Sequence, residues 1–369
     1  MNNILHIAKK IDSKSIEDYL TKINTEDVDT LSIVKNLSSF RFAMYPIILQ
    51  TISRLFFIHP KTKVLIKSLT DEDINDLSKE LIYLTAIMRA NLLLNDNQKE
   101  FQKEYVEDAK KFLDNMQDID KINNSFKGIG VQLVCFDWSK NYAYINSLYN
   151  GNTLISKNEF ITSIAPILFR HSMSQAITWD NKKQVLENDF ANIIYELFEN
   201  TELHARDESL VKKSIRGLRI KYTKIHENEN KDKYEDIKNY LSEFTNQEFI
   251  EISIFDSGNG LAASLASNSD FNFETEKKLV LKCFNKHISR TSLPTRGLGL
   301  FEVMSMIKKH KGLFVLRTGR TFLTADYSVI SFNENSLVLD DKYITKCQEI
   351  VGTSYTIILP LTQEGIQNV

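Results

Sequence analysis

Three polar residues at four-residue spacing, Glu196, Asn200 and His204, are the side chains best placed to do chemistry. They lie in the segment ELFENTELHA (196–205), at the end of an apolar stretch with helical periodicity, Val185–Leu203. Residues at this spacing project from one face of a helix. A carboxylate, an amide oxygen and an imidazole on one face can bind a hard cation and activate an attacking water or hydroxyl group.

Three further segments have the composition of turns that hold a phosphate or a base. DSGNG (256–260) directly follows the apolar run Phe249–Phe255, which predicts a strand that ends at Asp256. RGLGL (296–300) precedes a helical stretch, Phe301–His310, whose first N–H groups would face an anion. GTSYTIILPL (352–361) opens a strand. A simple β-turn explains DSGNG equally well when it is taken alone. All four segments in this order predict a site for a nucleoside triphosphate with its metal.

We call these segments the first to fourth box. They resemble the N, G1, G2 and G3 boxes of the GHKL ATPases. That family includes DNA gyrase B, heat-shock chaperones, MutL-type repair proteins, and the ATP-binding domains of histidine kinases and anti-sigma-factor kinases. The resemblance covers roughly the second half of the chain, whereas residues 1–150 show none. It implies that residues 155–365 form a Bergerat-type two-layer α/β sandwich that binds ATP with Mg²⁺.

The resemblance implies a role for four residues. The family residue that matches Asn200 supplies Mg²⁺ with an oxygen ligand, and the one that matches Glu196 orients or deprotonates the group attacking the γ-phosphate. The residue that matches Asp256 accepts a hydrogen bond from the adenine amino group, and the one that matches Thr353 helps to hold the adenine. The remaining residues expected at the nucleotide are Gly258, Gly260, Arg290, Arg296, Gly297, Gly299 and Leu300.

Neighbouring residues have structural explanations as well. We expect Glu199 and Glu202 to be solvated, and His204 to be structural rather than catalytic. The segment Leu261–Thr295 is expected to form a lid over ATP that is mobile without nucleotide. Basic residues near its end can contact phosphate, and the sequence does not select among Lys282, Lys286, His287, Arg290 and Arg296.

Composition narrows the class of protein. With 369 residues, 42% of them hydrophobic and 25% charged, the chain suits two ordinary folded domains. A net charge of −2 gives no overall basic field for nucleic acid or an anionic membrane. No stretch stays apolar over the roughly 20 residues that a spanning helix needs, and the start lacks the pattern of a signal peptide. Together with three scattered cysteines, these features predict a cytoplasmic protein with reduced thiols.

Apolar periodicity predicts an α+β protein in two parts. Residues 1–150 are expected to form a mainly helical region for sensing, dimerisation or partner binding, with a small β element. Its helices are expected at Ser15–Ile23, Phe40–Phe57, Asp71–Leu94 and Lys99–Met116, and its strands at Lys63–Ile66, Val131–Trp138 and Ala143–Leu148. In residues 155–365 we expect helices at Ile161–Thr178, Val185–Leu203 and Phe301–His310, and strands at Ile215–Ile225, Phe249–Phe255, Leu313–Arg317, Thr321–Tyr327 and Tyr355–Leu361.

Three functions agree with these residues. The first is a Mg²⁺-dependent ATPase whose nucleotide state controls a protein partner or effector. The second is an anti-sigma-type kinase that phosphorylates Ser or Thr of a partner, and the third is a non-enzymatic module regulated by ATP. Abundant Lys and Asn suggest a bacterial source, with phage defence as one setting. An autophosphorylating histidine kinase is not expected, because His171 is too close to Asn200 to leave room for the helical hairpin of such kinases.

Overall fold

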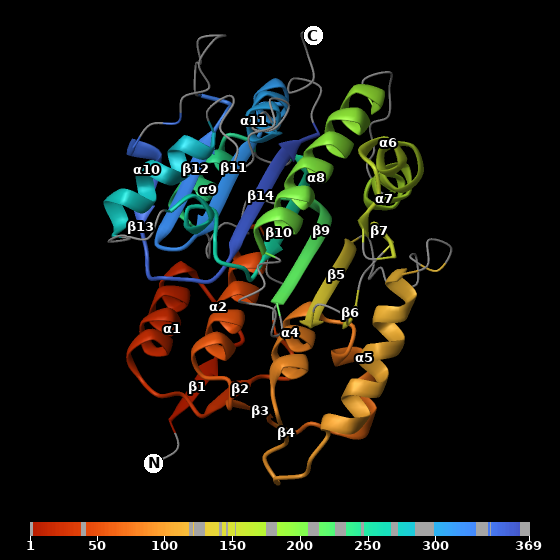
Figure 1. The fold of residues 1–369 in the computed structure, drawn as a ribbon, viewed down its shortest axis with the longest axis vertical. Coiled ribbons are helices and arrows are strands. Elements are labelled where there is room, and N and C mark those ends of the chain that lie inside the picture. The colour runs from red at the N-terminus through yellow and green to blue at the C-terminus, as the bar shows by residue number, and fades with distance from the viewer. Residues whose placement is uncertain are drawn as a thin grey trace.

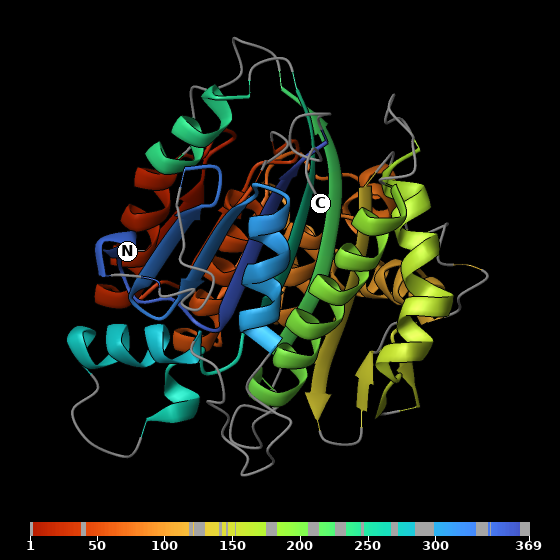
Figure 2. The same cartoon turned by 90° about the horizontal axis from the view of Figure 1, so that it is seen from above.

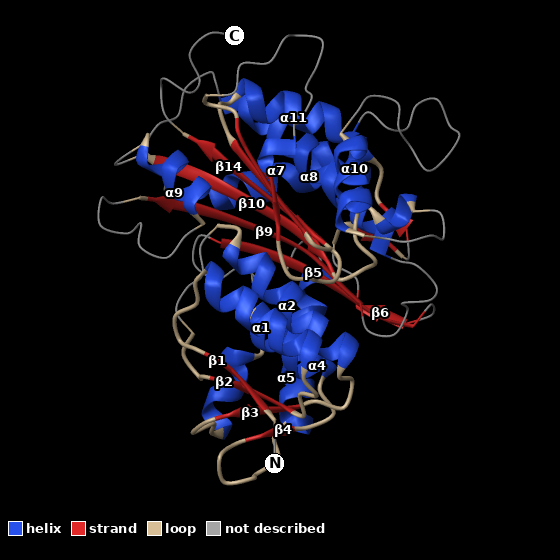
Figure 3. Ribbon diagram, turned by 90° about the vertical axis from the view of Figure 1, so that its left-hand side faces the viewer, coloured by secondary structure: helices blue, strands red, loops and turns tan. Residues whose placement is uncertain are grey.

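The protein is built in four layers, in which two sheets alternate with two layers of helices (Figures 1 and 3). The computed structural model describes residues 3–37, 42–117, 121, 130–139, 142–144, 147–151, 153–174, 183–205, 214–225, 234–244, 247–266, 272–284, 299–329, 339 and 341–361. A small parallel sheet forms one outer layer. Helices separate it from a large antiparallel sheet, and further helices cover the far face of that sheet. The chain is therefore a mixed α/β protein, as its sequence predicts.

The N-terminal part alternates strands and helices. A parallel sheet of order β1-β2-β3-β4 forms one face, and helices α1, α2 and α4 are its crossovers. The strands are β1 (Ile4–Ile7), β2 (Thr30–Ile33), β3 (Lys63–Ile66) and β4 (Leu93–Leu94). The helices are α1 (Ser13–Thr25), α2 (Met44–Ile58), α3 (Ile74–Leu77), α4 (Leu81–Arg89) and α5 (Gln102–Gln117), with a 3-10 turn at Asp71–Asp73.

Local sequence explains where these helices begin. Asp12 caps α1, because its Oδ1 accepts a hydrogen bond from Ser15 N at 2.7 Å. Pro46 lies in the first turn of α2, where its missing N–H leaves no hydrogen bond unmade. Every residue of α4 is buried, since this helix lies between the two sheets. Its apolar residues therefore occupy all sides of the helix.

The predicted N-terminal region differs from the observed one. The strand expected at Lys63–Ile66 is present as β3, but β1, β2 and β4 were not expected. With two to four residues each, these strands are too short to show a period-two pattern. The single helix expected over Asp71–Leu94 is divided into a 3-10 turn, α3, α4 and β4. The region is thus mainly helical, as expected, but its strands form a parallel sheet that the sequence analysis did not predict.

The large sheet has eight strands in the order β13-β12-β11-β14-β10-β9-β5-β6, with every pair antiparallel. The hairpin expected near residues 131–148 is present as β5–β6. It pairs with β9, so it belongs to the large sheet and not to the N-terminal region that was expected to extend to residue 150. The strands are β5 (Gly130–Ser139), β6 (Tyr142–Tyr144), β9 (Ser214–Lys224), β10 (Glu248–Asp256), β11 (Leu313–Thr318), β12 (Thr321–Asp326), β13 (Ile344–Lys346) and β14 (Thr353–Pro360).

Both faces of this sheet are covered. Helices α7, α8, α10 and α11 lie on one face, and the N-terminal helices α1, α2 and α4 lie on the other (Figures 2 and 3). The strands β10 and β14 are buried along almost their whole length, which explains their nearly continuous apolar sequences. The additional helices are α6 (Lys157–Glu159), α7 (Ala165–Ser172), α8 (Lys183–Ala205), α9 (Glu235–Ser242), α10 (Phe273–Cys283) and α11 (Gly299–Lys309), and a π-helical turn spans Phe160–Ile164.

Two smaller features complete the description. A two-stranded ribbon of β7 (Tyr149–Asn150) and β8 (Thr153–Leu154) precedes α6. The segment expected to be a lid, Leu261–Thr295, contains a 3-10 turn at Ala263–Leu265 and the helix α10, whereas 267–271 and 285–298 lie outside the described residues. None of the helices in the described ranges is both long enough and apolar enough to cross a membrane.

Candidate functional site

The second and fourth boxes meet at the carboxylate of Asp256. This residue ends β10 and is only 3% exposed. Its Oδ1 accepts two backbone hydrogen bonds, from Gly258 N at 2.8 Å and from Thr353 N at 3.2 Å. Because β10 and β14 are antiparallel neighbours, the end of one lies beside the start of the other. Within the described part of the chain, Oδ2 of Asp256 accepts no hydrogen bond, so this oxygen remains available to a donor on a ligand.

The buried position of Asp256 changes its acidity. Burial raises the pKa of Asp256 to about 7, although the hydrogen bonds from Gly258 and Thr353 and the charge of Arg216 act in the opposite direction. The carboxyl group is therefore close to half ionised at neutral pH. A ligand donor that reached Oδ2 would favour the ionised form, because hydrogen bonds to the charged form stabilise it.

Glycines allow three of the boxes to touch one another. A Cβ on Gly258 would lie 2.5 Å from Cα of Ala205, the last residue of α8. Gly260 has a φ of +87°, and a Cβ there would lie 2.9 Å from Oγ1 of Thr318. Gly352 has a φ of +72°, and its Cβ would lie 2.0 Å from the carbonyl oxygen of Asp256. Any larger residue would force the first, second and fourth boxes apart.

Thr318, the last residue of β11, joins the second and fourth boxes through its hydroxyl group. Its Oγ1 accepts a hydrogen bond from Leu261 N at 3.0 Å and donates to Gly352 O at 3.1 Å. The hydroxyl of Thr353 lies 3.3 Å away, close enough for a further hydrogen bond. The sequence analysis did not identify Thr318, since a threonine at a strand end carries no distinctive signal.

The first and third boxes meet at the carboxylate of Glu196. A Cβ on Gly299, the first residue of α11, would lie 2.3 Å from Oε2 of Glu196. The other carboxylate oxygen, Oε1, accepts a hydrogen bond from Lys157 Nζ at 2.7 Å. The side chain of Glu196 is 17% exposed and that of Lys157 is 37% exposed. The carboxylate thus lies between an ammonium group and the first turn of α11, at the edge of solvent.

Asn200 follows Glu196 by one turn of α8, and its side chain is partly exposed. Among the described residues its amide makes no hydrogen bond, so the amide oxygen is available to a cation. Leu300 is 9% exposed and belongs to the hydrophobic core, so only its backbone can serve a ligand. Arg290, Arg296 and Gly297 lie outside the described residues, as does the side chain of His204.

Glu202 is a correction to the sequence analysis, which placed it in solvent. Its Oε2 accepts a hydrogen bond from Arg216 Nη1 at 2.6 Å, and the hydroxyl of Tyr149 donates to the same oxygen at 2.6 Å. Arg216 is fully buried and also binds both carboxylate oxygens of Asp137, at 2.8 and 3.1 Å. A buried guanidinium needs such partners. This network anchors the end of α8 to β5 and β9.

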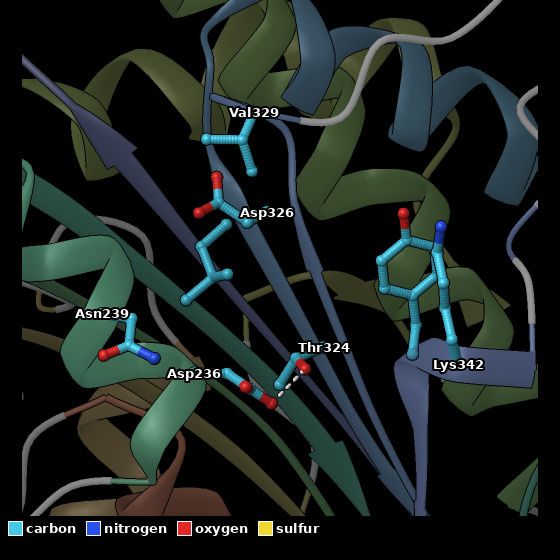
Figure 4. Close-up of a pocket in the computed structure, with 8 residues that line it drawn as sticks. Asp236, Asn239, Thr324, Asp326, Val329 and Lys342 are labelled. Carbon is cyan, nitrogen blue, oxygen red and sulfur yellow. Dashed lines mark hydrogen bonds between the residues drawn. The ribbon is translucent and has the colours of Figure 1, made fainter.

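The structure also contains a pocket of about 410 Å³ that none of the boxes lines. It lies at the end of β11 and β12 opposite to Thr318, beside α9 (Figure 4). Three of its polar residues are engaged, since Thr324 Oγ1 donates to Asp236 Oδ2 at 2.6 Å and Asp326 Oδ1 accepts from Ser328 N at 2.8 Å. This pocket is separate from the site that the boxes form.

The fold gathers Asp256, Gly258, Gly260 and Thr353 in one place, and Glu196 and Gly299 in another. Two clusters form, one around Asp256 and one around Glu196, and α8 carries both Glu196 and the residue that packs on Gly258. A buried acceptor, glycine turns and a partly exposed amide fit a nucleotide with its metal. No family model matches this chain, and no curated protein or solved structure matches it.

Proposed function

We propose that residues 155–365, together with the hairpin β5–β6 of the same sheet, form an ATP-binding domain of the GHKL type, with the helices α8 and α11 and the antiparallel sheet as the two layers of a Bergerat-type sandwich. One observation carries this proposal. Two boxes that are far apart in the sequence share the buried carboxylate of Asp256, whose Oδ1 accepts hydrogen bonds from Gly258 and Thr353. A β-turn that binds no ligand could form without a buried carboxyl group, and burying one whose second oxygen accepts no hydrogen bond from the described residues is unfavourable. A ligand that donates to this oxygen explains why the group is there.

The base is recognised by the cluster around Asp256. Its free oxygen accepts a hydrogen bond from the exocyclic amine of adenine, whereas guanine presents a carbonyl at that position. Gly258 and Gly260 have no side chains, so the base can approach the backbone of the turn. The hydroxyl groups of Thr353 and Thr318 lie on the other side of the base. These contacts make the site selective for ATP over nucleotides with a 6-carbonyl group.

The phosphates lie between α8 and α11. Asn200 supplies one neutral oxygen ligand to Mg²⁺, which neutralises phosphate charge when bound. Gly299 begins α11, so the free N–H groups of its first turn face the phosphates. Arg290, Arg296 and Gly297, from the third box and the segment before it, are proposed as further phosphate contacts.

Glu196 orients or deprotonates the group that attacks the γ-phosphate. This assignment gives slow ATP hydrolysis, with the nucleotide state controlling a protein partner. The ion pair between Glu196 and Lys157 favours a second candidate, an ATP-regulated module without turnover. The ammonium group of Lys157 donates to Oε1 at 2.7 Å, so that oxygen is already engaged and does not face an attacking group. Transfer to Ser or Thr of a partner uses the same residues and is the third outcome to be measured.

Calorimetry with ATP and Mg²⁺ tests the proposal. We expect binding by the wild type and loss of most of the Mg²⁺-dependent part in Asn200→Ala. Asn188→Ala is the matched control, because Asn188 is an exposed residue at the other end of the same helix. Labelled ATP then separates the three functions by giving free phosphate, labelled partner or neither. A wild-type protein without ATP affinity would refute the assignment to this family.

A further inference from the structure

The N-terminal layer contacts the second and fourth boxes from the far side of the large sheet. Helices α2 and α4 pack on the face opposite to α8 and α11 (Figures 1 and 3). In particular, α2 contacts both β10 and β14, the two strands that end or begin at the boxes. Most side chains of these helices are apolar and buried, but two polar ones donate hydrogen bonds to residues at or beside the boxes.

Arg89 is the first of these polar residues. It is the last residue of α4 and is 7% exposed. Its Nη1 donates to Ser53 O of α2 at 3.0 Å, and its Nη2 donates to Ser257 Oγ at 2.9 Å. Burial lowers the pKa of Arg89 to about 10, so the guanidinium is charged at neutral pH. Ser257 directly follows Asp256, and its Oγ also accepts from Ile215 N at 2.9 Å. The charge-assisted bond therefore fixes the first residue of the turn.

Gln50 is the second. It lies on α2, is 1% exposed, and its Nε2 donates to Val351 O at 3.0 Å and to Arg317 O at 3.5 Å. Val351 precedes Gly352, whose added Cβ would lie 2.0 Å from Asp256 O. The backbone that Gln50 holds is therefore in direct contact with both Asp256 and Ser257.

Arg89 and Gln50 thus each hold a backbone segment that lies next to the carboxylate of Asp256. Gly258 and Thr353 donate to its Oδ1, and each lies one or two residues beyond a backbone segment that the N-terminal layer holds. We propose that Arg89 and Gln50 are positioning residues, which orient Asp256 and so set the selectivity of the site for adenine. This inference rests on the proposed function of the site. It also couples the two parts of the protein, because an N-terminal contact that favours adenine binding must be favoured by adenine in return.

The test compares ATP with inosine triphosphate, which carries a carbonyl where ATP carries the amine. Calorimetry is done on the full-length wild type, Arg89→Met and Gln50→Met. Because each variant removes a hydrogen bond that holds the backbone beside Asp256, we expect ATP affinity to weaken about tenfold, which corresponds to about 1.4 kcal/mol. We expect the affinity for inosine triphosphate to change by less than about twofold, since that ligand offers Asp256 no amine.

Tyr45→Phe is the matched control. Tyr45 also lies on α2, and its hydroxyl donates to Gln132 Oε1 of β5 at 3.4 Å, between the same two layers but away from the boxes. The ratio of the two affinities should stay at the wild-type value in this variant. A merely structural loss would lower the fraction of competent protein equally for both nucleotides, and calorimetric stoichiometry measures that fraction.

A double variant shows whether Arg89 acts through Asp256. In an Asp256→Asn background, Arg89→Met should weaken ATP affinity no further, because residues that share one pathway are not additive. An unchanged ratio in Arg89→Met and Gln50→Met, in a wild type that prefers ATP, overturns this inference alone. A wild type that binds neither nucleotide overturns the proposed function as well. If Arg89→Met does not fold, Gln50→Met decides the question by the same ratio.

Discussion

Gly299→Ala offers a sharp test of Glu196, because one methyl group would displace its carboxylate. The Cβ would lie 2.3 Å from Oε2 of Glu196, whereas ordinary contact begins near 3.4 Å. The carboxylate must therefore move by about 1 Å or change its rotamer. A misplacement of about 1 Å can cost about 10²-fold in rate when a group has to be aligned with the reacting atoms. We expect turnover of ATP to fall by about that factor.

The same substitution should leave stability nearly unchanged. Gly299 does not have a positive φ, so alanine suits its backbone. Alanine in place of glycine in a helix favours folding by up to about 1 kcal/mol. Weakening the partly exposed ion pair between Lys157 and Glu196 costs about 0.2–1 kcal/mol. Since these terms oppose each other, the melting temperature should change by only a few degrees.

The assay combines phosphate release, ATP affinity by calorimetry and thermal unfolding on the same preparation. Ser305→Ala is the control, because it introduces alanine on α11 at a residue whose hydroxyl, among the described residues, makes one hydrogen bond, to Phe301 O of the same helix. A lower rate with near wild-type affinity is the expected result. Wild-type turnover in Gly299→Ala would show that the position of Glu196 does not matter. A large loss of ATP affinity would instead indicate that the methyl group blocks the phosphates.

Three further predictions follow from the site. Glu196→Gln should lower turnover by about 10²–10⁴-fold with little change in ATP affinity, whereas Glu187→Gln on the opposite side of α8 should change neither. ATP affinity should rise between pH 6 and 8 as Asp256 ionises, and calorimetry should find a weaker rise for inosine triphosphate, which has the same phosphates. Limited proteolysis should cut within 261–295 without nucleotide, and a non-hydrolysable ATP analogue should protect that segment; identical cleavage would remove the lid from the proposal.

Most strands of the large sheet and the helices α8 and α11 could be predicted because their sequences are long and regular, whereas β13 and α10 were not expected. The strands β10 and β14 are buried along almost their whole length, so each appears as an extended apolar run, and α8 shows apolar residues at helical spacing. The parallel sheet could not be predicted, because strands of two to four residues are too short to show the alternation of apolar and polar residues that indicates a strand. The pairing of β5 with β9 was also missed, because nothing in a hairpin's own sequence indicates which strand lies next to it.

The site divides in the same way. The four boxes are local patterns, and the fold does bring them together at Asp256 and Glu196. Contacts between residues that are far apart in the chain could not be predicted, because no local sequence pattern indicates them. Lys157 is 39 positions from Glu196, Arg89 is 168 positions from Ser257, and Gln50 is 301 positions from Val351. In the sequence, each of the three looks like any other polar residue of a helix. Only the structure could therefore identify their hydrogen-bond partners.

The acidity of Asp256 explains why a site of this kind benefits from a ligand. Its pKa is about 7 in the folded protein, above the value of 3.8 for the unfolded chain. Below the pKa of the unfolded state, the carboxyl group is neutral in both states, so its ionisation does not change the free energy of unfolding. Between these two values the unfolded state loses its proton first, so stability falls as pH rises, by a few kcal/mol in order of magnitude. The penalty is fully present above about pH 7. A donor from adenine offsets part of it, because it stabilises the ionised carboxylate that burial disfavours. Stabilisation by ATP should therefore be greatest where the protein alone bears this cost in full.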